Sequence, residues 1–81
     1  MEAYYTIDFT YPDGHVETLF QEFATRRDAQ DFGFNMLNQV AATERFHGGE
    51  SVIDPYFIII KHEGKTRVTV YDSRARYKAV R

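Results

Sequence analysis

The apolar run at residues 57–60, Phe-Ile-Ile-Ile, is the sequence feature that most restricts the possible folds. Four consecutive apolar residues rich in isoleucine are typical of a strand whose two faces are both covered. The run leads into the turn pair Glu63-Gly64 and then into an alternating segment, residues 65–72. The sequence therefore predicts a β-hairpin whose first strand lies inside a sheet.

A two-residue turn at Glu63-Gly64 would set the register of this hairpin. Ile59 would then lie opposite Val68, and these side chains would belong to an apolar core face. The complete set of predicted pairs is Ile59 with Val68 and Phe57 with Val70 on the core face, and Ile60 with Arg67, Ile58 with Thr69 and Tyr56 with Tyr71 on the other face.

A second hairpin is predicted at the start of the chain. Residues 3–11 alternate between apolar and polar side chains, and Pro12-Asp13-Gly14 supplies turn chemistry. If Asp13-Gly14 are the two loop residues, the opposed pairs are Tyr11 with Val16, Phe9 with Thr18 and Ile7 with Phe20. This register, which we favour, buries Phe20 and leaves Leu19 on the other face. A loop longer by one residue would exchange the two, because a slip by one inverts every side chain.

A helix is predicted to follow Thr25, which has the side chain of an N-cap and is followed three residues later by Asp28. The helix should end around Arg45-Phe46. Gly33 inside it costs about 1 kcal/mol relative to alanine, so we expect it to allow a close approach to the sheet. Phe34 is expected to point away from the apolar stripe. That stripe consists of Ala29, Phe32, Gly33, Met36, Leu37 and Val40.

The predicted element order is ββαββ, followed by a short basic tail at residues 73–81. Strand order 2-1-3-4 makes both hairpins antiparallel and places the two most apolar strands in the centre. The result is a single α+β domain over residues 1–81, a two-layer sandwich with one helix on one face of a four-stranded antiparallel sheet.

Composition excludes several classes. The 81 residues include no cysteine, so neither a disulfide nor a thiolate metal site stabilises the fold. No apolar run approaches the roughly 20 residues of a membrane span, and no signal peptide is read at the start. We expect a cytoplasmic protein with no membrane contact. Residues 1–24 carry five acidic and no basic side chains, whereas residues 51–81 are rich in lysine and arginine. This asymmetry predicts complementary contacts within the fold or between copies.

The sheet face opposite the helix is the main candidate for function, because its predicted side chains are more apolar than those of a solvated face. Three interpretations compete: the tail folds back so that Tyr77 and Val80 cover the patch, two copies form a homodimer, or a different protein binds. We favour a non-enzymatic protein-binding module that associates with itself first, and a regulatory or inhibitory role would suit it. The predicted partner-binding residues are Tyr4, Leu19, Tyr56, Ile58, Ile60, Arg67 and Tyr71.

The alternative is single-stranded nucleic-acid binding, in which sheet tyrosines stack on bases and basic residues contact phosphates. The overall acidic charge and Asp8 on the same face oppose this interpretation. The basic and aromatic residues assigned to it are Arg67, Arg74, Arg76, Tyr77 and Lys78.

No enzyme chemistry is predicted. His15, His47 and His62 do not have the spacing of metal ligands, although the loop from His47 to Asp54 holds one histidine and two carboxylates. A polar glycine-containing loop explains that segment more simply. Because no nucleophile–base pair or phosphate-binding glycine loop is present, we predict no catalytic residue, no metal and no cofactor.

Overall fold

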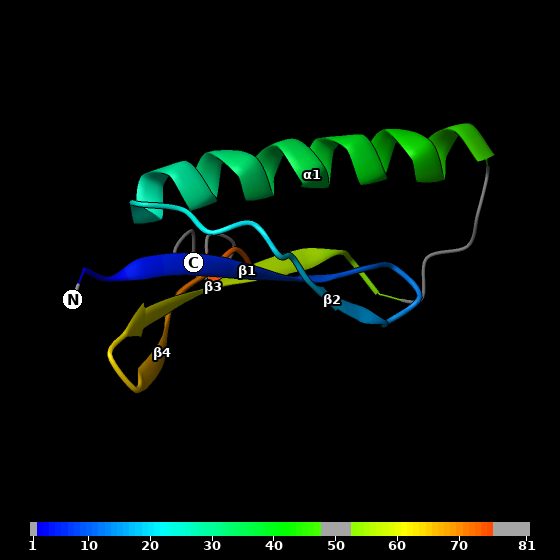
Figure 1. Ribbon diagram of the computed structural model, residues 1–81. Coiled ribbons are helices and arrows are strands. Elements are labelled where there is room, and N and C mark those ends of the chain that lie inside the picture. Colours follow the sequence, from blue (N-terminus) through cyan, green and yellow to red (C-terminus); the bar gives the residue numbers. More distant parts are fainter. Residues whose placement is uncertain (1, 48–52, 76–81) are drawn as a thin grey trace.

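The fold has two layers, a four-stranded antiparallel sheet and one helix that crosses one of its faces (Figure 1). The computed structural model describes residues 2–47 and 53–75, with side chains for 2–40 and 53–75. The strand order is β2-β1-β3-β4, so the predicted α+β class and topology are confirmed. Residues 76–81 of the predicted tail, including Tyr77 and Val80, lie outside the described part. The elements are β1 (Tyr4–Thr10), β2 (Val16–Thr18), α1 (Arg26–His47), β3 (Tyr56–Glu63) and β4 (Thr66–Asp72).

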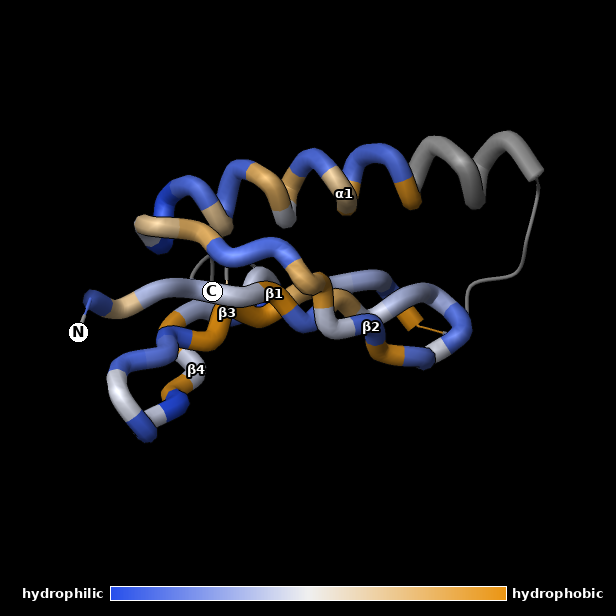
Figure 2. The backbone as a smooth tube through the Cα atoms, in the orientation of Figure 1, coloured by the Kyte–Doolittle hydropathy of each residue, from blue (hydrophilic) through white to orange (hydrophobic). Residues whose placement is uncertain are grey.

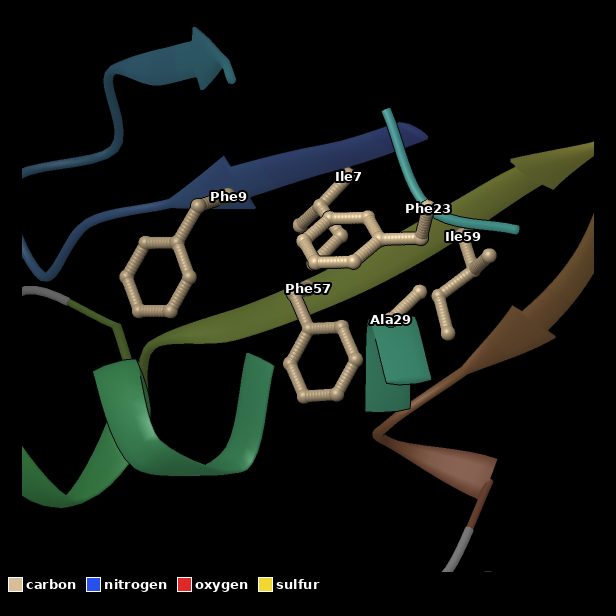
Figure 3. Packing of buried hydrophobic residues seen from close by; sticks show 6 residues of the cluster. All are labelled: Ile7, Phe9, Phe23, Ala29, Phe57 and Ile59. Atoms are coloured by element: carbon tan, nitrogen blue, oxygen red, sulfur yellow. The ribbon is translucent and has the colours of Figure 1, made fainter. Parts of the chain in front are cut away.

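The core lies between α1 and the two central strands. Ile7 pairs with Ile59 and Phe9 with Phe57 across β1 and β3, and all four side chains are fully buried (Figure 3). The predicted helical stripe faces them, and Figure 2 shows hydrophilic residues of α1 on the side turned away from the sheet. The stripe residues that pack on the core are Ala29, Phe32, Met36, Leu37 and Val40.

The start of α1 is capped as predicted. Thr25 Oγ1 accepts a hydrogen bond of 3.1 Å from the backbone amide of Asp28. This bond satisfies one of the amides that an α-helix leaves without a partner in its first turn. The carboxylate of Asp28 also lies near the positive end of the helix, where a negative charge is stabilising.

Gly33 sets how closely the helix approaches the sheet. A Cβ atom at this position would lie 2.5 Å from Cε2 and Cζ of Phe57, well inside van der Waals contact. Only a residue without a side chain therefore lets this turn of α1 rest on the Phe57 ring. The predicted close approach is confirmed, and its position is the centre of the core.

The β1–β2 register differs by one residue from the favoured prediction. The amide of Tyr11 donates to the His15 carbonyl at 2.9 Å, and Gly14 has a positive φ of 94°. The loop therefore contains three residues, with glycine in the conformation that such loops require. Phe9 lies opposite Glu17 rather than Thr18.

This shift exchanges the two residues after β2. Leu19 packs against the core, and its amide donates to the carbonyl of Ile7 at 2.9 Å. Phe20 is fully exposed. The favoured assignment of Phe20 to the core and Leu19 to the other face was wrong. The loop has three residues where two were predicted, and a shift of one residue exchanges the two faces of a strand.

The β3–β4 register also differs. The turn is Gly64-Lys65, so Glu63 lies opposite Thr66 and Ile60 opposite Thr69. An irregularity follows between Ile59 and Ile60: the pairing shifts by one and Ile59 lies opposite Tyr71. A β-bulge of this kind inserts one extra residue into one strand and changes which side chains reach each face beyond it.

The bulge moves Tyr71 to the helix side, so its predicted place on the opposite face was wrong. Its ring centroid lies 5.9 Å from that of Phe57 and 6.3 Å from that of Phe34. Phe34 was predicted to point away from the apolar stripe, and this too was wrong: its ring meets Phe57 edge to face at 5.0 Å. Its partners are aromatic rings on two strands, Phe57 of β3 and, through the bulge, Tyr71 of β4.

Replacing Gly33 with alanine should destabilise the fold, although alanine is the better helix former. The gain in helix propensity is about 1 kcal/mol, whereas forcing a methyl group into a packed core costs about 1–3 kcal/mol. We expect Gly33→Ala to lower the free energy of unfolding by ~1 kcal/mol in urea denaturation. Asn35→Ala, at an exposed site on the same helix, is the control and should not destabilise. An increase in stability for Gly33→Ala would contradict the close packing on Phe57.

Candidate interaction surface on the helix-free face

Strand alternation defines a second sheet face that no described helix or strand covers, which we call the open face (Figure 1). Because Ile7, Phe9, Phe57 and Ile59 point to the helix, the residues between them point the opposite way. The open face has four rows across the strands, named by their β3 residue. They are the Tyr56 row (Val16, Thr10, Tyr56, Arg74), the Ile58 row (Thr18, Asp8, Ile58, Asp72), the Ile60 row (Thr6, Ile60, Thr69) and the His62 row (Tyr4, His62, Arg67).

Five of the seven predicted partner-binding residues share this face: Tyr4, Tyr56, Ile58, Ile60 and Arg67. Leu19 and Tyr71 do not, because the longer β1–β2 loop and the β4 bulge turn them to the core. Ile58 and Ile60 are half-buried and point away from the helix. The structure thus confirms the geometric part of the prediction, an isoleucine pair on the side without a helix.

Sequence reasoning missed Val16 on this face and the exposure of Phe20 after β2. Val16 lies opposite Thr10 and is 58% exposed, and Phe20 has no burial at all. The signal was present in the sequence as the turn Pro12-Asp13-Gly14, which fits a three-residue loop as well as a two-residue one. Choosing the three-residue loop would have placed Val16 and Leu19 correctly.

An aromatic pair forms the end of the open face at the His62 row. The rings of Tyr4 and His62 stack in parallel with centroids 4.6 Å apart. Nε2 of His62 lies 2.7 Å from Oγ1 of Thr6, within hydrogen-bonding distance. These contacts fix the orientation of the imidazole relative to Tyr4 and Thr6.

Arg74 lies over the ring of Tyr56 at one end of the Tyr56 row. The guanidinium of Arg74 lies 3.8 Å from the centre of the Tyr56 ring and binds both oxygens of Asp72, with Nη2 to Oδ2 at 2.7 Å and Nε to Oδ1 at 3.1 Å. The hydrogen bonds to Asp72 raise the pKa of Arg74 above its ordinary value. The cation therefore covers one face of Tyr56 and is already paired with a carboxylate.

Among the described residues of the open face, Asp8 is the one with a buried, unsatisfied side-chain oxygen. Its neighbours across the strands are Thr18 and Ile58. Its Oδ1 atom is buried and has no hydrogen-bond partner among the described residues. A buried acceptor without a donor costs about 1–3 kcal/mol. This carboxylate therefore reduces the stability of the domain while it places negative charge beside the isoleucines.

A polar cluster lies away from this face, at the β1–β2 loop. The Tyr11 and His15 rings stack at 4.4 Å, and the Tyr11 hydroxyl donates to Glu17 at 2.7 Å, which raises the pKa of Tyr11. The amide and then the ring of His15 bond to Asp13 and lower the pKa of that carboxyl. These exposed contacts connect the two ends of the loop.

A shallow hollow of about 490 Å³ follows the first turns of α1. All of its described lining comes from this one helix, so it has no opposing wall in the part of the chain that the structure describes. The lining residues are Arg26, Arg27, Gln30, Asp31 and Phe34. Within the described ranges, no three histidine or carboxylate side chains gather as a metal site would require. The predicted loop from His47 to Asp54 falls mostly on residues 48–52, which lie outside these ranges.

Fold and surface together define a class: a small two-layer α+β protein whose sheet has one helix-covered face and one open, partly apolar face. The comparisons with known proteins add no relative, since no protein-family model, curated protein or solved structure matches the chain. No helix in the described part is long and apolar enough to cross a membrane.

Asp8→Val should stabilise the domain. Valine removes the buried acceptor and suits a β-strand between Thr18 and Ile58. We expect a gain of about 1 kcal/mol in the free energy of unfolding, measured by urea denaturation at a protein concentration too low for association. Thr69→Val, a polar-to-apolar change on the same face that removes no orphaned acceptor, is the control. A loss of stability in Asp8→Val would show that the carboxylate has a stabilising partner.

Proposed function

We propose that this protein is a small, non-enzymatic binding module that associates with a second copy of itself through the open face. The observation that carries the proposal is the place of Ile58 and Ile60, side by side on β3 and directed away from the only helix in the described residues. Tyrosine, isoleucine and arginine are the residue types enriched at the centres of protein interfaces. A regulatory or inhibitory role in the cytoplasm is compatible with such a module.

The size of the open face sets the expected strength of association. β3 has eight residues, and with strands about 4.8 Å apart and a rise of about 3.3 Å per residue a four-stranded face covers roughly 500 Å². A standard interface buries about 800 Å² per partner. The dimer should therefore be weak and depend strongly on concentration, unless Phe20 and Val16 extend the contact.

Nucleic-acid binding is the less favoured function. Arg74 is bound to Asp72 and covers one face of Tyr56, which removes a phosphate contact and a stacking surface together. Asp8 and Asp72 also place two carboxylates in one row of the face, where they would repel phosphates. Of the other residues assigned to this function, Arg67 lies on the open face, whereas Arg76, Tyr77 and Lys78 fall outside the described residues.

Ile60→Asp tests self-association. Its neighbours across the strands, Thr6 and Thr69, are uncharged, so an aspartate there should leave the helix-side core intact. Ile58 is the poorer test site because it lies between Asp8 and Asp72. We expect the wild type to show a rise in mean mass with concentration in light scattering and sedimentation, and Ile60→Asp to remain monomeric.

Val68→Asp is the matched control for this experiment. Val68 is 49% exposed on the same hairpin, but it lies opposite Lys61 on the helix side of the sheet. This variant should associate like the wild type. A wild type that stays monomeric up to millimolar concentration, or equal effects of both substitutions, would overturn the proposal. A salt-dependent complex with single-stranded RNA that is lost in Arg67→Ala would favour nucleic acid instead.

A further inference from the structure

The charges of the open face are ordered by row. Both carboxylates, Asp8 and Asp72, lie in the Ile58 row. Arg74, in the neighbouring Tyr56 row, is bound to Asp72, whereas Arg67 lies two rows beyond the Ile58 row, in the His62 row, and the Ile60 row between them is uncharged. A line through the Ile60 row therefore separates a side with two carboxylates and one guanidinium, Arg74, from a side that carries the cation Arg67 and no carboxylate among the described residues of the face.

The β4 bulge creates this order. If the pairing of Ile60 with Thr69 continued without a shift, Tyr71 would lie opposite Ile58 and Asp72 opposite Phe57, on the helix side. The one-residue shift sends the tyrosine to the core and the aspartate to the open face. The same irregularity thus completes the core and supplies half of the acidic row.

Two copies can stack their open faces about a two-fold axis that lies in the plane between the two sheets. This axis can run parallel to the strands or across them. An axis parallel to the strands places each row on the same row of the other copy, so that Asp8 and Asp72 of both copies would share one row. An axis across the strands, through the Ile60 row, reverses the row order. The Ile58 row of each copy then meets the His62 row of the other, and acid meets base.

We propose that the module forms a two-fold, sheet-to-sheet dimer in which the strands of the two copies run antiparallel, Ile60 stacks on Ile60, and Arg67 of each copy faces Asp72 of the other. This inference rests on the proposed function and adds its geometry. Two aligned sheets pack about 10 Å apart with their strands within about 30° of each other, a spacing that leaves room for these side chains.

The two side chains of the proposed pair both reach the surface of the described structure. Arg67 is exposed and has no carboxylate within ion-pair distance among the described residues. Asp72 binds Arg74 through both of its oxygens and is 32% exposed, so part of its carboxylate lies at the surface. Since such pairs lie at the rim of a small interface, their main effect is on orientation and on the salt dependence of association.

A charge-exchange experiment tests the geometry directly. In the proposed dimer, Arg67→Asp alone places like charges at both symmetry-related contacts, and so does Asp72→Arg alone. When the two variants are mixed, each of the two contacts again joins one acid and one base. We expect each variant alone to associate at least tenfold more weakly than the wild type, and the mixture to recover most of that loss, in sedimentation at low salt. Lys65→Glu, in the exposed β3–β4 turn, is the control and should change neither.

A second measurement does not depend on Asp72→Arg folding correctly. Because the chain has no cysteine, the variant Arg67→Cys can carry a spin label at that position alone. The labelled variant is mixed with ¹⁵N-enriched wild type that carries no spin label. The inverted stacking predicts broadening of the amide signals of Asp72 and Ser73 in the enriched copy. Stacking of like rows about an axis along β3 predicts broadening around Tyr4 and His62 instead, and would overturn the geometry.

The outcomes separate the two levels of the proposal. Association that Ile60→Asp abolishes, but that the mixed charge variants do not restore, would overturn the inverted stacking and leave self-association through the open face intact. A monomeric wild type would overturn both.

Discussion

The contact between Gly33 and the ring of Phe57 is the constraint on which the two-layer arrangement depends. One helix must cover a sheet whose central pairs are Ile7 with Ile59 and Phe9 with Phe57. In a chain of this size the core is thin, so a helix held a few ångströms higher would leave voids that no other described element fills. Glycine at this turn of α1 brings the backbone onto the aromatic ring, and the neighbouring Phe34 then reaches its edge.

The bulge in β4 completes the packing around this contact. Phe34 and Phe57 leave an aromatic site beside them that Tyr71 fills at centroid distances of 6.3 and 5.9 Å. Regular pairing would have sent Tyr71 to the open face. The shift closes the core with a third ring and, as its consequence, turns Asp72 outward to bind Arg74. The same register shift therefore affects both the helix-side packing and the charge pattern of the opposite face.

The architecture could be predicted because each main element has a local sequence pattern. These patterns are the apolar run at residues 57–60, the alternation in β1, and the apolar stripe and Thr25 cap of α1. The registers did not follow, because they depend on a single residue. Asp13-Gly14 fits loops of two or three residues, and nothing in β4 signals a bulge before its partner rings are known. These two differences moved Leu19 and Tyr71 off the predicted surface, while Ile58 and Ile60, in the middle of the best-determined strand, stayed on it.

Asp8 shows that the open face is not arranged for the stability of the single chain. An apolar or β-branched side chain at this point of β1 would complete a row with Ile58, yet the chain holds a carboxylate there whose Oδ1 atom has no donor among the described residues. A face selected only to be tolerated by water would instead lack the isoleucines. The proposed self-association would account for this combination, since misplaced like charges exclude wrong pairings more strongly than correct ones add affinity.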